Sequence, residues 1–210
     1  MTNRARFITL EGSEGAGKTT ALKTIKKILN NWGVEYICTR EPGGEPNAEK
    51  IREILLHSEH LHAKTELLLM FAARNEHIEN VIKPALAKGV WVVSDRFVDA
   101  SYAYQGGGRE LGYDVVKWMD NFIVGEVQAD LTVLMDIEPE IGLQRIKSRG
   151  QADRIELEGI EFFHRITRSY RDKAKLEPSK YAIIDASKSF KSVKLAIISA
   201  FESKKKELIK

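Results

Sequence analysis

One short segment, Gly12-Ser13-Glu14-Gly15-Ala16-Gly17-Lys18-Thr19, matches the pattern G-x-x-x-x-G-K-[ST] without a gap. It follows the apolar run Phe7–Leu10 and leads into a helical pattern, which is the context that this motif requires. Its glycines let the backbone bend so that several N–H groups point at one phosphate, and the helix that follows adds the positive end of its dipole. A chance glycine-rich turn is the alternative, but four specified positions in this context rarely coincide. The segment therefore predicts a nucleoside triphosphate site.

The residue types within this segment predict separate tasks. Lys18 can bridge the β- and γ-phosphates, and the hydroxyl of Thr19 can coordinate Mg²⁺. We expect the nucleotide to be bound by the loop and the first helical turn, namely Gly12, Ser13, Glu14, Gly15, Ala16, Gly17, Lys18, Thr19 and Thr20. The motif alone leaves kinases, motors and switches open.

The rest of the chain alternates short apolar runs with longer segments of helical period. We expect strands at Phe7–Leu10, Val34–Cys38, Val90–Ser94, Leu131–Asp136 and Tyr181–Ile184. We expect helices at Thr19–Leu29, Ala48–His57, Thr65–Val81, Asp114–Val124, Glu140–Lys147, Gly159–Leu176 and Val193–Leu208, with Pro84 breaking the third or starting a new turn. This alternation predicts one α/β domain over residues 1–210, with a mostly parallel sheet, helices on both faces and ligands at the carboxyl ends of the strands.

The composition limits the class of protein. The chain has 210 residues, of which 43% are apolar and 30% charged, and 33 Lys plus Arg against 30 Asp plus Glu give a net charge of +3. These values indicate a folded, soluble protein, and so small an excess of positive charge does not indicate a nucleic-acid or membrane partner. Cys38 is the only cysteine, which excludes an internal disulfide and suits a reducing compartment. No signal-peptide or membrane-spanning pattern is found, so we expect a cytoplasmic location.

A second charged site is expected where the third strand ends. Asp95 and Arg96 directly follow the apolar run Val90–Ser94. If this strand lies beside the phosphate-loop strand, Asp95 lies near the metal and serves as a Mg²⁺ ligand, partly through water. Arg96 would then face a second anion. An ordinary surface ion pair is the alternative.

Two further segments carry side chains suited to a base and its phosphate. Phe71 and Arg74 share one helix face, where an aromatic ring can stack on a base and the arginine can bind its phosphate. Gln105 offers a donor and an acceptor together, as reading a pyrimidine edge requires, beside a flexible turn expected at residues 106–108. Taken alone, Phe71 favours core packing.

Arginines cluster after the fourth strand. Arg149 and Arg154 flank a polar loop that contains Gly150, and such a loop can close over the γ-phosphate and supply charge to the transition state. We expect a small mobile lid at about residues 146–158. For Arg165 and Arg168 a solvated helix face is the preferred interpretation.

Taken together, these segments resemble the bacterial thymidylate (dTMP) kinases. The resemblance runs from Phe7 to about Ser187. It is carried by residues 11–20 and by the phrases Thr39-Arg40-Glu41-Pro42-Gly43-Gly44, Ile51-Arg52-Glu53-Ile54-Leu55, Phe71-Ala72-Ala73-Arg74, Asp95-Arg96-Phe97, Tyr104-Gln105-Gly106-Gly107-Gly108-Arg109 and Asp153-Arg154-Ile155-Glu156. It implies a phosphate-loop kinase of three layers around a five-stranded parallel sheet, usually homodimeric.

The resemblance also implies an activity, the transfer of the γ-phosphate of ATP to dTMP with Mg²⁺, and a role for each site residue. Phe71 would stack on thymine, and Ser101 and Gln105 would meet the base edge. Arg52 would lie near the O4 side of thymine, and Arg74 would lie along the base or the phosphate. Arg96 would hold the acceptor phosphate, Glu14 would approach the 3′-hydroxyl or the metal, and Tyr104 would disfavour ribonucleotides. Arg145 would lie against adenine. The residues expected to act in catalysis are Lys18, Asp95, Arg96, Arg149 and Arg154, with Mg²⁺ on Thr19 and Asp95.

Two alternatives stay open at this point. The first is a kinase for another acceptor, such as dUMP, UMP or a deoxynucleoside, although Arg74 and Arg96 favour an acceptor that already carries a phosphate. The second is a catalytically inactive nucleotide-binding regulator. Such a regulator would be expected to lack the phosphate-loop lysine or a lid arginine, and this chain has both.

Overall fold

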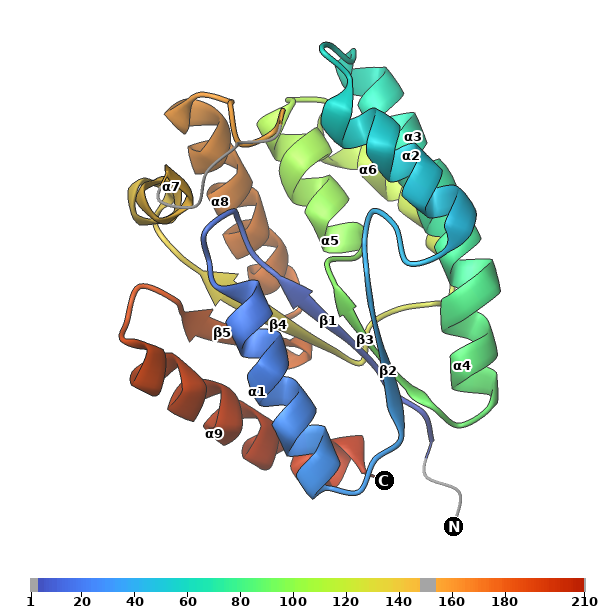
Figure 1. Cartoon of the computed structure of the whole chain (residues 1–210), viewed down its shortest axis with the longest axis vertical. Helices are drawn as coiled ribbons and strands as arrows, with labels where there is room; N and C mark the ends of the chain where they lie inside the picture. Colours follow the sequence, from blue (N-terminus) through green and yellow to red (C-terminus); the bar gives the residue numbers. More distant parts are fainter. Residues whose placement is uncertain (1–3, 148–153, 210) are drawn as a thin grey trace.

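A parallel sheet forms the centre of the structure, a computed structural model that describes residues 4–147 and 154–209 (Figure 1). Its strand order is β2-β3-β1-β4-β5, and every neighbouring pair is parallel. The strands are β1 (Phe7–Glu11), β2 (Tyr36–Arg40), β3 (Trp91–Asp95), β4 (Leu131–Asp136) and β5 (Tyr181–Asp185). The α/β fold and the strands expected from the sequence are confirmed, with small shifts at the strand ends.

Helices connect the strands and cover both faces of the sheet (Figure 1). The α-helices are α1 (Lys18–Asn31), α2 (Pro46–His57), α3 (Ala63–His77), α4 (Lys83–Ala87), α5 (Val98–Ser101), α6 (Tyr113–Met119), α7 (Pro139–Lys147), α8 (Ile160–Leu176) and α9 (Phe190–Leu208). Wider π-helical turns are η1 (Ile78–Ile82), η2 (Tyr102–Gly108) and η3 (Asp120–Val124), and η4 (Pro178–Lys180) is a 3₁₀ turn. Within residues 4–147 and 154–209, none of these helices combines the length and the apolar character needed to cross a membrane.

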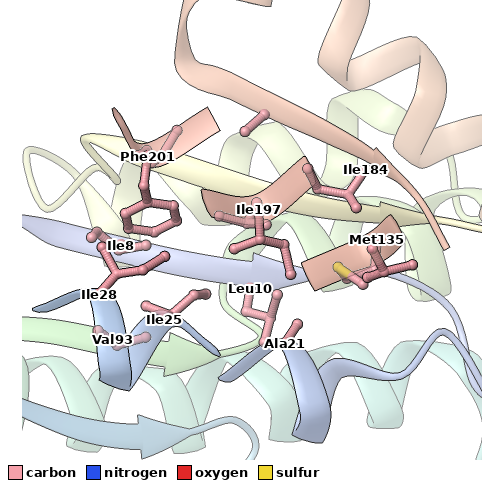
Figure 2. Packing of buried hydrophobic residues seen from close by; sticks show 14 of the residues in the cluster. Ile8, Leu10, Ala21, Ile25, Ile28, Val93, Met135, Ile184, Ile197 and Phe201 are labelled. Carbon is pink, nitrogen blue, oxygen red and sulfur yellow. The ribbon is translucent and has the colours of Figure 1, made fainter. Parts of the chain in front are cut away.

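The alternation of side chains along β1 divides the core between the two faces. Ile8 and Leu10 pack on one face with α1 and α9, as Figure 2 shows around Ile25 and Phe201. Phe7 packs on the other face. Since burying one large apolar side chain contributes about 1.5–3 kcal/mol, both cores help to keep the middle strand rigid. The phosphate-loop segment therefore begins from a firmly held strand end.

The third expected helix changes its winding before Pro84. The α-helical part ends at His77, the π-helical turn Ile78–Ile82 follows, and α4 begins with Pro84 in its first turn. Proline has no amide proton for the hydrogen-bond ladder, and the first turn of a helix is where that loss is tolerated. The expected interruption at Pro84 is confirmed.

The expected flexible turn at residues 106–108 is wrong. These glycines lie within η2 and are covered by α8. A Cβ atom on Gly107 would lie 2.0 Å from Oγ of Ser169, and one on Gly108 would lie 2.6 Å from the ring of Phe162. The glycines are needed so that two helical segments can approach closely, and this tight packing holds the preceding residues, Gln105 among them, in place.

The lid expected at about residues 146–158 is described only at its two ends. α7 ends at Lys147, and residues 154–158 form turns ahead of α8. Arg149 lies outside the described residues, so its role stays a prediction. Arg154 lies within them, and its contacts are given below.

Candidate active site

The carboxyl ends of the central strands meet at one edge of the sheet. In the parallel register Leu10 and Arg40 both pair with Asp95, so β1, β2 and β3 end side by side. A cleft opens there, as expected for this class of fold. Its walls contain most of the expected site residues: Glu14, Gly15, Ala16, Gly17, Lys18, Thr19, Thr20, Arg52, Asp95, Arg96, Tyr104, Gln105 and Arg154.

The phosphate loop leads from β1 into α1. Gly17 adopts the left-handed conformation with φ 84°, and α1 begins at the next residue, Lys18. The Lys18 ammonium donates to the carbonyl oxygens of Gly12 (3.0 Å) and Ser13 (3.2 Å), so it lies across the loop. Burial lowers the pKa of Lys18, and the nearby Arg96 charge lowers it further. An anion bound in the loop would therefore relieve an unfavourable concentration of positive charge.

Asp95 and Thr19 are the residues expected to hold Mg²⁺. Both line the cleft, and Oδ1 of Asp95 is buried without a hydrogen-bond partner among the described residues. Mg²⁺ commonly takes one or two protein oxygens and fills its other positions with water and substrate phosphates. In keeping with so small a protein ligand set, the described part of the chain has no cluster of three His, Cys, Asp or Glu residues suited to a metal. The unpaired Asp95 oxygen fits the expected role.

Arg96 is held at the cleft by an unusual backbone conformation and by several partners. Its φ is 70°, which is uncommon for a residue other than glycine. Its guanidinium donates to the Gly12 carbonyl (3.1 Å), forms an ion pair with Glu14 and lies 4.7 Å from the ring centre of Tyr104. The Tyr104 hydroxyl also donates to Glu14 at 3.0 Å. The structure thus brings together Glu14, Arg96 and Tyr104, as the resemblance implies.

A buried carboxylate below Arg96 was not anticipated as a site residue. Glu11, at the end of β1, accepts hydrogen bonds from the Phe97 amide (2.7 Å) and the Tyr170 hydroxyl (2.9 Å). Burial raises the pKa of Glu11 to about 8, with Asp99 adding to the effect. Because Glu11 binds the residue after Arg96, it fixes the backbone from which Arg96 reaches the cleft. The sequence signal for a role of Glu11 was its position directly before Gly12, the first glycine of the phosphate-loop motif.

Glu66 of α3 is the second carboxylate that sequence reasoning missed. Its oxygens accept from Nε2 of Gln105 (2.8 Å) and Nη2 of Arg154 (2.8 Å), and it forms an ion pair with Arg109 at 3.1 Å. Arg154 also donates twice to the Leu55 carbonyl, at 3.0 and 3.1 Å. The described end of the lid is therefore tied to the wall formed by α2 and α3. A glutamate at the start of an apolar helical stretch was the only hint in the sequence.

Comparison with known proteins agrees with this geometry. Residues 10–197 match the family model described as thymidylate kinase. The chain belongs to the thymidylate kinase family. Proteins named thymidylate kinase from Methylobacillus flagellatus and Pseudomonas putida are 47% and 48% identical over 195 and 193 residues, covering 93% and 91% of this chain and 96% and 93% of theirs. One from Hahella chejuensis is 45% identical over 200 residues, covering 94% of this chain and 96% of its own.

Three residues that the thymidylate kinase resemblance places on the base lie behind the cleft wall. Phe71, Arg74 and Ser101 are fully buried, and none of them lines the cleft. The Arg74 guanidinium is bound by Glu41 (2.8 Å), by Oγ of Ser101 (2.9 Å) and by the Phe97 carbonyl (3.0 Å). Phe71 also packs in the core beside β1 and β3, so its stacking on a base stays a prediction.

The helix face explains this difference. On α3, Glu66 and Met70 are four residues apart and share the face that lines the cleft, whereas Phe71 belongs to the core between α3 and the sheet. The apolar part of the cleft wall consists instead of Leu55, Leu56, Met70, Ala100 and Ile155. A one-residue offset along a helix turns a side chain by about 100°, which is enough to move it from the cleft to the core.

Of the two remaining expected residues, Arg52 lines the cleft and Arg145 does not. Arg52 donates to the Pro42 carbonyl at 2.8 Å. Arg145 of α7 donates to the carbonyls of Gly15 (3.3 Å) and Ala186 (3.0 Å), beside the phosphate loop. This position agrees with a contact to ATP rather than to the acceptor nucleotide.

The phosphate loop and α7 meet backbone to backbone. A Cβ atom on Gly15 would lie 2.1 Å from the Gly142 carbonyl oxygen, and one on Gly142 would lie 2.5 Å from the Glu14 carbonyl oxygen. Separations under 3.0 Å require something to move, and backbone atoms move at a high cost. Gly142 thus supports the loop from outside the motif, and a glycine in the middle of an expected helix was the signal for it.

We expect Gly142→Ala to raise the KM for ATP at least about fivefold, because overpacking of this kind costs about 1–3 kcal/mol and every 1.4 kcal/mol is a factor of ten. Alanine improves helix propensity, so any loss cannot come from α7 itself unwinding. Steady-state kinetics with varied ATP measure the effect. Gly159→Ala is the matched control because nothing lies within 4 Å of the added methyl. An unchanged KM in Gly142→Ala would contradict the role of this contact.

Proposed function

We propose that the chain phosphorylates dTMP with ATP, giving dTDP and ADP for dTTP synthesis. One observation carries the proposal beyond family membership. Lys18, from the phosphate loop, and Arg96, from the end of β3, donate to the same carbonyl oxygen, that of Gly12. Two cations from separate segments thus meet at one point of the cleft, which suits two phosphate groups brought together for transfer.

The reaction needs little catalysis of proton transfer. The acceptor is already a phosphate anion near neutral pH, so no general base is required. The task is to align two anions and to neutralise their repulsion. Lys18 would bind the donor phosphates, Arg96 would bind the acceptor phosphate, and Arg149 and Arg154 would add charge from the lid. We propose that Thr19 and Asp95 hold Mg²⁺, partly through water, which would screen the charge of the ATP phosphates.

The apolar wall of the cleft suits the base of a pyrimidine nucleotide. The apolar residues Leu55, Met70 and Ala100 offer a surface for the base, and Gln105 offers hydrogen bonds to its edge. Phe71 would support this wall from the core. Arg52 would lie near the O4 side of the base.

The sugar would lie between the base and the phosphate. There, Tyr104 and Glu14 line the cleft and are joined by a hydrogen bond. We propose that Tyr104 disfavours ribonucleotides and that Glu14 faces the 3′-hydroxyl. At the far end, Arg145 would lie against the adenine of ATP.

An ADP-release assay with dTMP, dUMP, UMP and thymidine tests this function directly. We expect turnover with dTMP to exceed turnover with each of the other acceptors. Thymidine lacks the anion that Arg96 would bind, and UMP carries the 2′-hydroxyl beside Tyr104. Equal kcat/KM for UMP and dTMP would contradict the role of Tyr104, and no ADP release with any acceptor would favour the inactive-regulator alternative.

We expect Arg149→Ala and Arg154→Ala each to lower kcat at least about 10²-fold while ATP still binds, because an arginine at a phosphoryl transition state is typically worth 10³–10⁵ in rate. Single-turnover kinetics and calorimetric ATP titration separate the two effects. Arg168→Ala serves as a control from the exposed surface of α8. Near-normal kcat in both single variants and in the double variant would remove the lid arginines from the mechanism.

We also propose a homodimer in the cytoplasm. Trp118 and Phe122 stack with ring centres 5.5 Å apart, yet they are 64% and 72% exposed, so they offer an apolar surface for a second copy. The free cysteine Cys38 suits a reducing compartment. We expect sedimentation equilibrium to show a dimer that Trp118→Glu weakens at least about tenfold, since burying a charge in place of an aromatic side chain is unfavourable. A dimer of unchanged affinity would exclude this surface.

A further inference from the structure

Glu66 lies at the meeting point of four segments of the chain. Its side chain is 1% exposed, and it contacts Gln105 of η2, Arg109 after η2 and Arg154 ahead of α8. A buried carboxylate without such partners would be strongly unfavourable, and a glutamine would fill the same space without a charge. We therefore asked what a charged group does here that a neutral one would not.

A carboxylate differs from an amide in that it only accepts hydrogen bonds when ionised. Burial alone would raise the pKa of Glu66, but the Gln105 hydrogen bond and the Arg109 and Arg154 charges lower it overall, so the carboxylate is ionised at neutral pH. Only the Nε2 end of the Gln105 amide can face such a group. The 2.8 Å contact between Nε2 of Gln105 and Oε1 of Glu66 is therefore fixed in its direction.

This direction decides what Gln105 presents to a ligand. Gln105 lines the cleft, and its Oε1 atom is buried with no hydrogen-bond partner in the described part of the chain. A buried acceptor without a donor costs free energy that a bound ligand can recover. The unpaired atom of the Gln105 amide is thus an acceptor, and a base that reaches it must offer a donor.

We propose that Glu66 is a specificity-determining residue: by holding the Gln105 amide in one orientation, it makes the cleft accept a base with an N–H group at ring position 3 and reject one with a bare nitrogen there. This inference rests on the proposed function, in which Gln105 meets the base edge. Thymine carries the N3–H donor. In cytosine N3 is itself an acceptor, so it would face Oε1 of Gln105 lone pair to lone pair.

Glu66→Gln tests the proposal because the new amide can either donate or accept, which frees Gln105 to turn over. The probes are dTMP and 5-methyl-dCMP, which share the methyl group and differ in the hydrogen-bonding pattern at positions 3 and 4. We expect the ratio of the dissociation constant of 5-methyl-dCMP to that of dTMP, measured by calorimetry, to be at least about tenfold smaller in Glu66→Gln than in the unaltered protein. A tenfold change is about the size of one mismatched hydrogen bond. Glu76→Gln, on the same helix but bonded to Asn47 at 3.0 Å, should keep the ratio.

The outcomes separate a specificity role from a merely structural one. A parallel loss of affinity for both nucleotides, with the ratio unchanged, would overturn the proposal. If Glu66→Gln does not fold, the unaltered protein decides the matter through 5-methyl-dCMP, in which N3 is an acceptor and carries no added group. We expect it to bind at least about tenfold more weakly than dTMP, and equal binding would refute the assignment. Failure of the unaltered protein to turn over dTMP would instead refute the proposed function.

Discussion

The structure depends on holding two cations next to each other before any anion is present. Lys18 and Arg96 share the Gly12 carbonyl, and each charge makes the other less favourable. Glu14 pairs with Arg96, and Glu11 accepts a hydrogen bond from the amide of the next residue, Phe97, so both glutamates help to position the arginine. The sheet contributes by ending β1 and β3 at the same level, which places these groups within reach of one another. A bound phosphate would take over part of the charge compensation that Glu14 provides for Arg96.

Local pattern was sufficient to predict most of this arrangement. A strand, a glycine loop and a helix form one continuous segment, so the loop position follows from hydrophobic period and glycine spacing alone. Asp95 and Arg96 could be placed at the cleft because parallel strands end at a common edge. Both arguments need only the order of elements along the chain. They do not require knowledge of how any two helices pack.

Helix packing is what the sequence left undetermined. Whether Phe71 or Met70 faces the cleft depends on the rotation of α3 about its axis, which is set by contacts with α2, η3 and η2. The glycines at residues 106–108 indicated a turn by local preference, but their actual function is close packing against α8. Glu11 and Glu66 were missed for a related reason. A glutamate in an apolar run becomes interpretable only once its partners, distant in the sequence, are known.

Arg74 shows why a motif residue does not always touch a ligand. Its guanidinium binds Glu41, and the other oxygen of Glu41 contacts His77 at 2.9 Å, which in turn contacts Thr39 at 2.6 Å. Breaking such a buried pair by removing one partner typically costs about 3–5 kcal/mol, because a charge is left uncompensated. This network connects the end of β2 to α3, and the Pro42 carbonyl that binds Arg52 directly follows Glu41. Arg74 therefore helps to hold the loop whose Pro42 carbonyl binds Arg52.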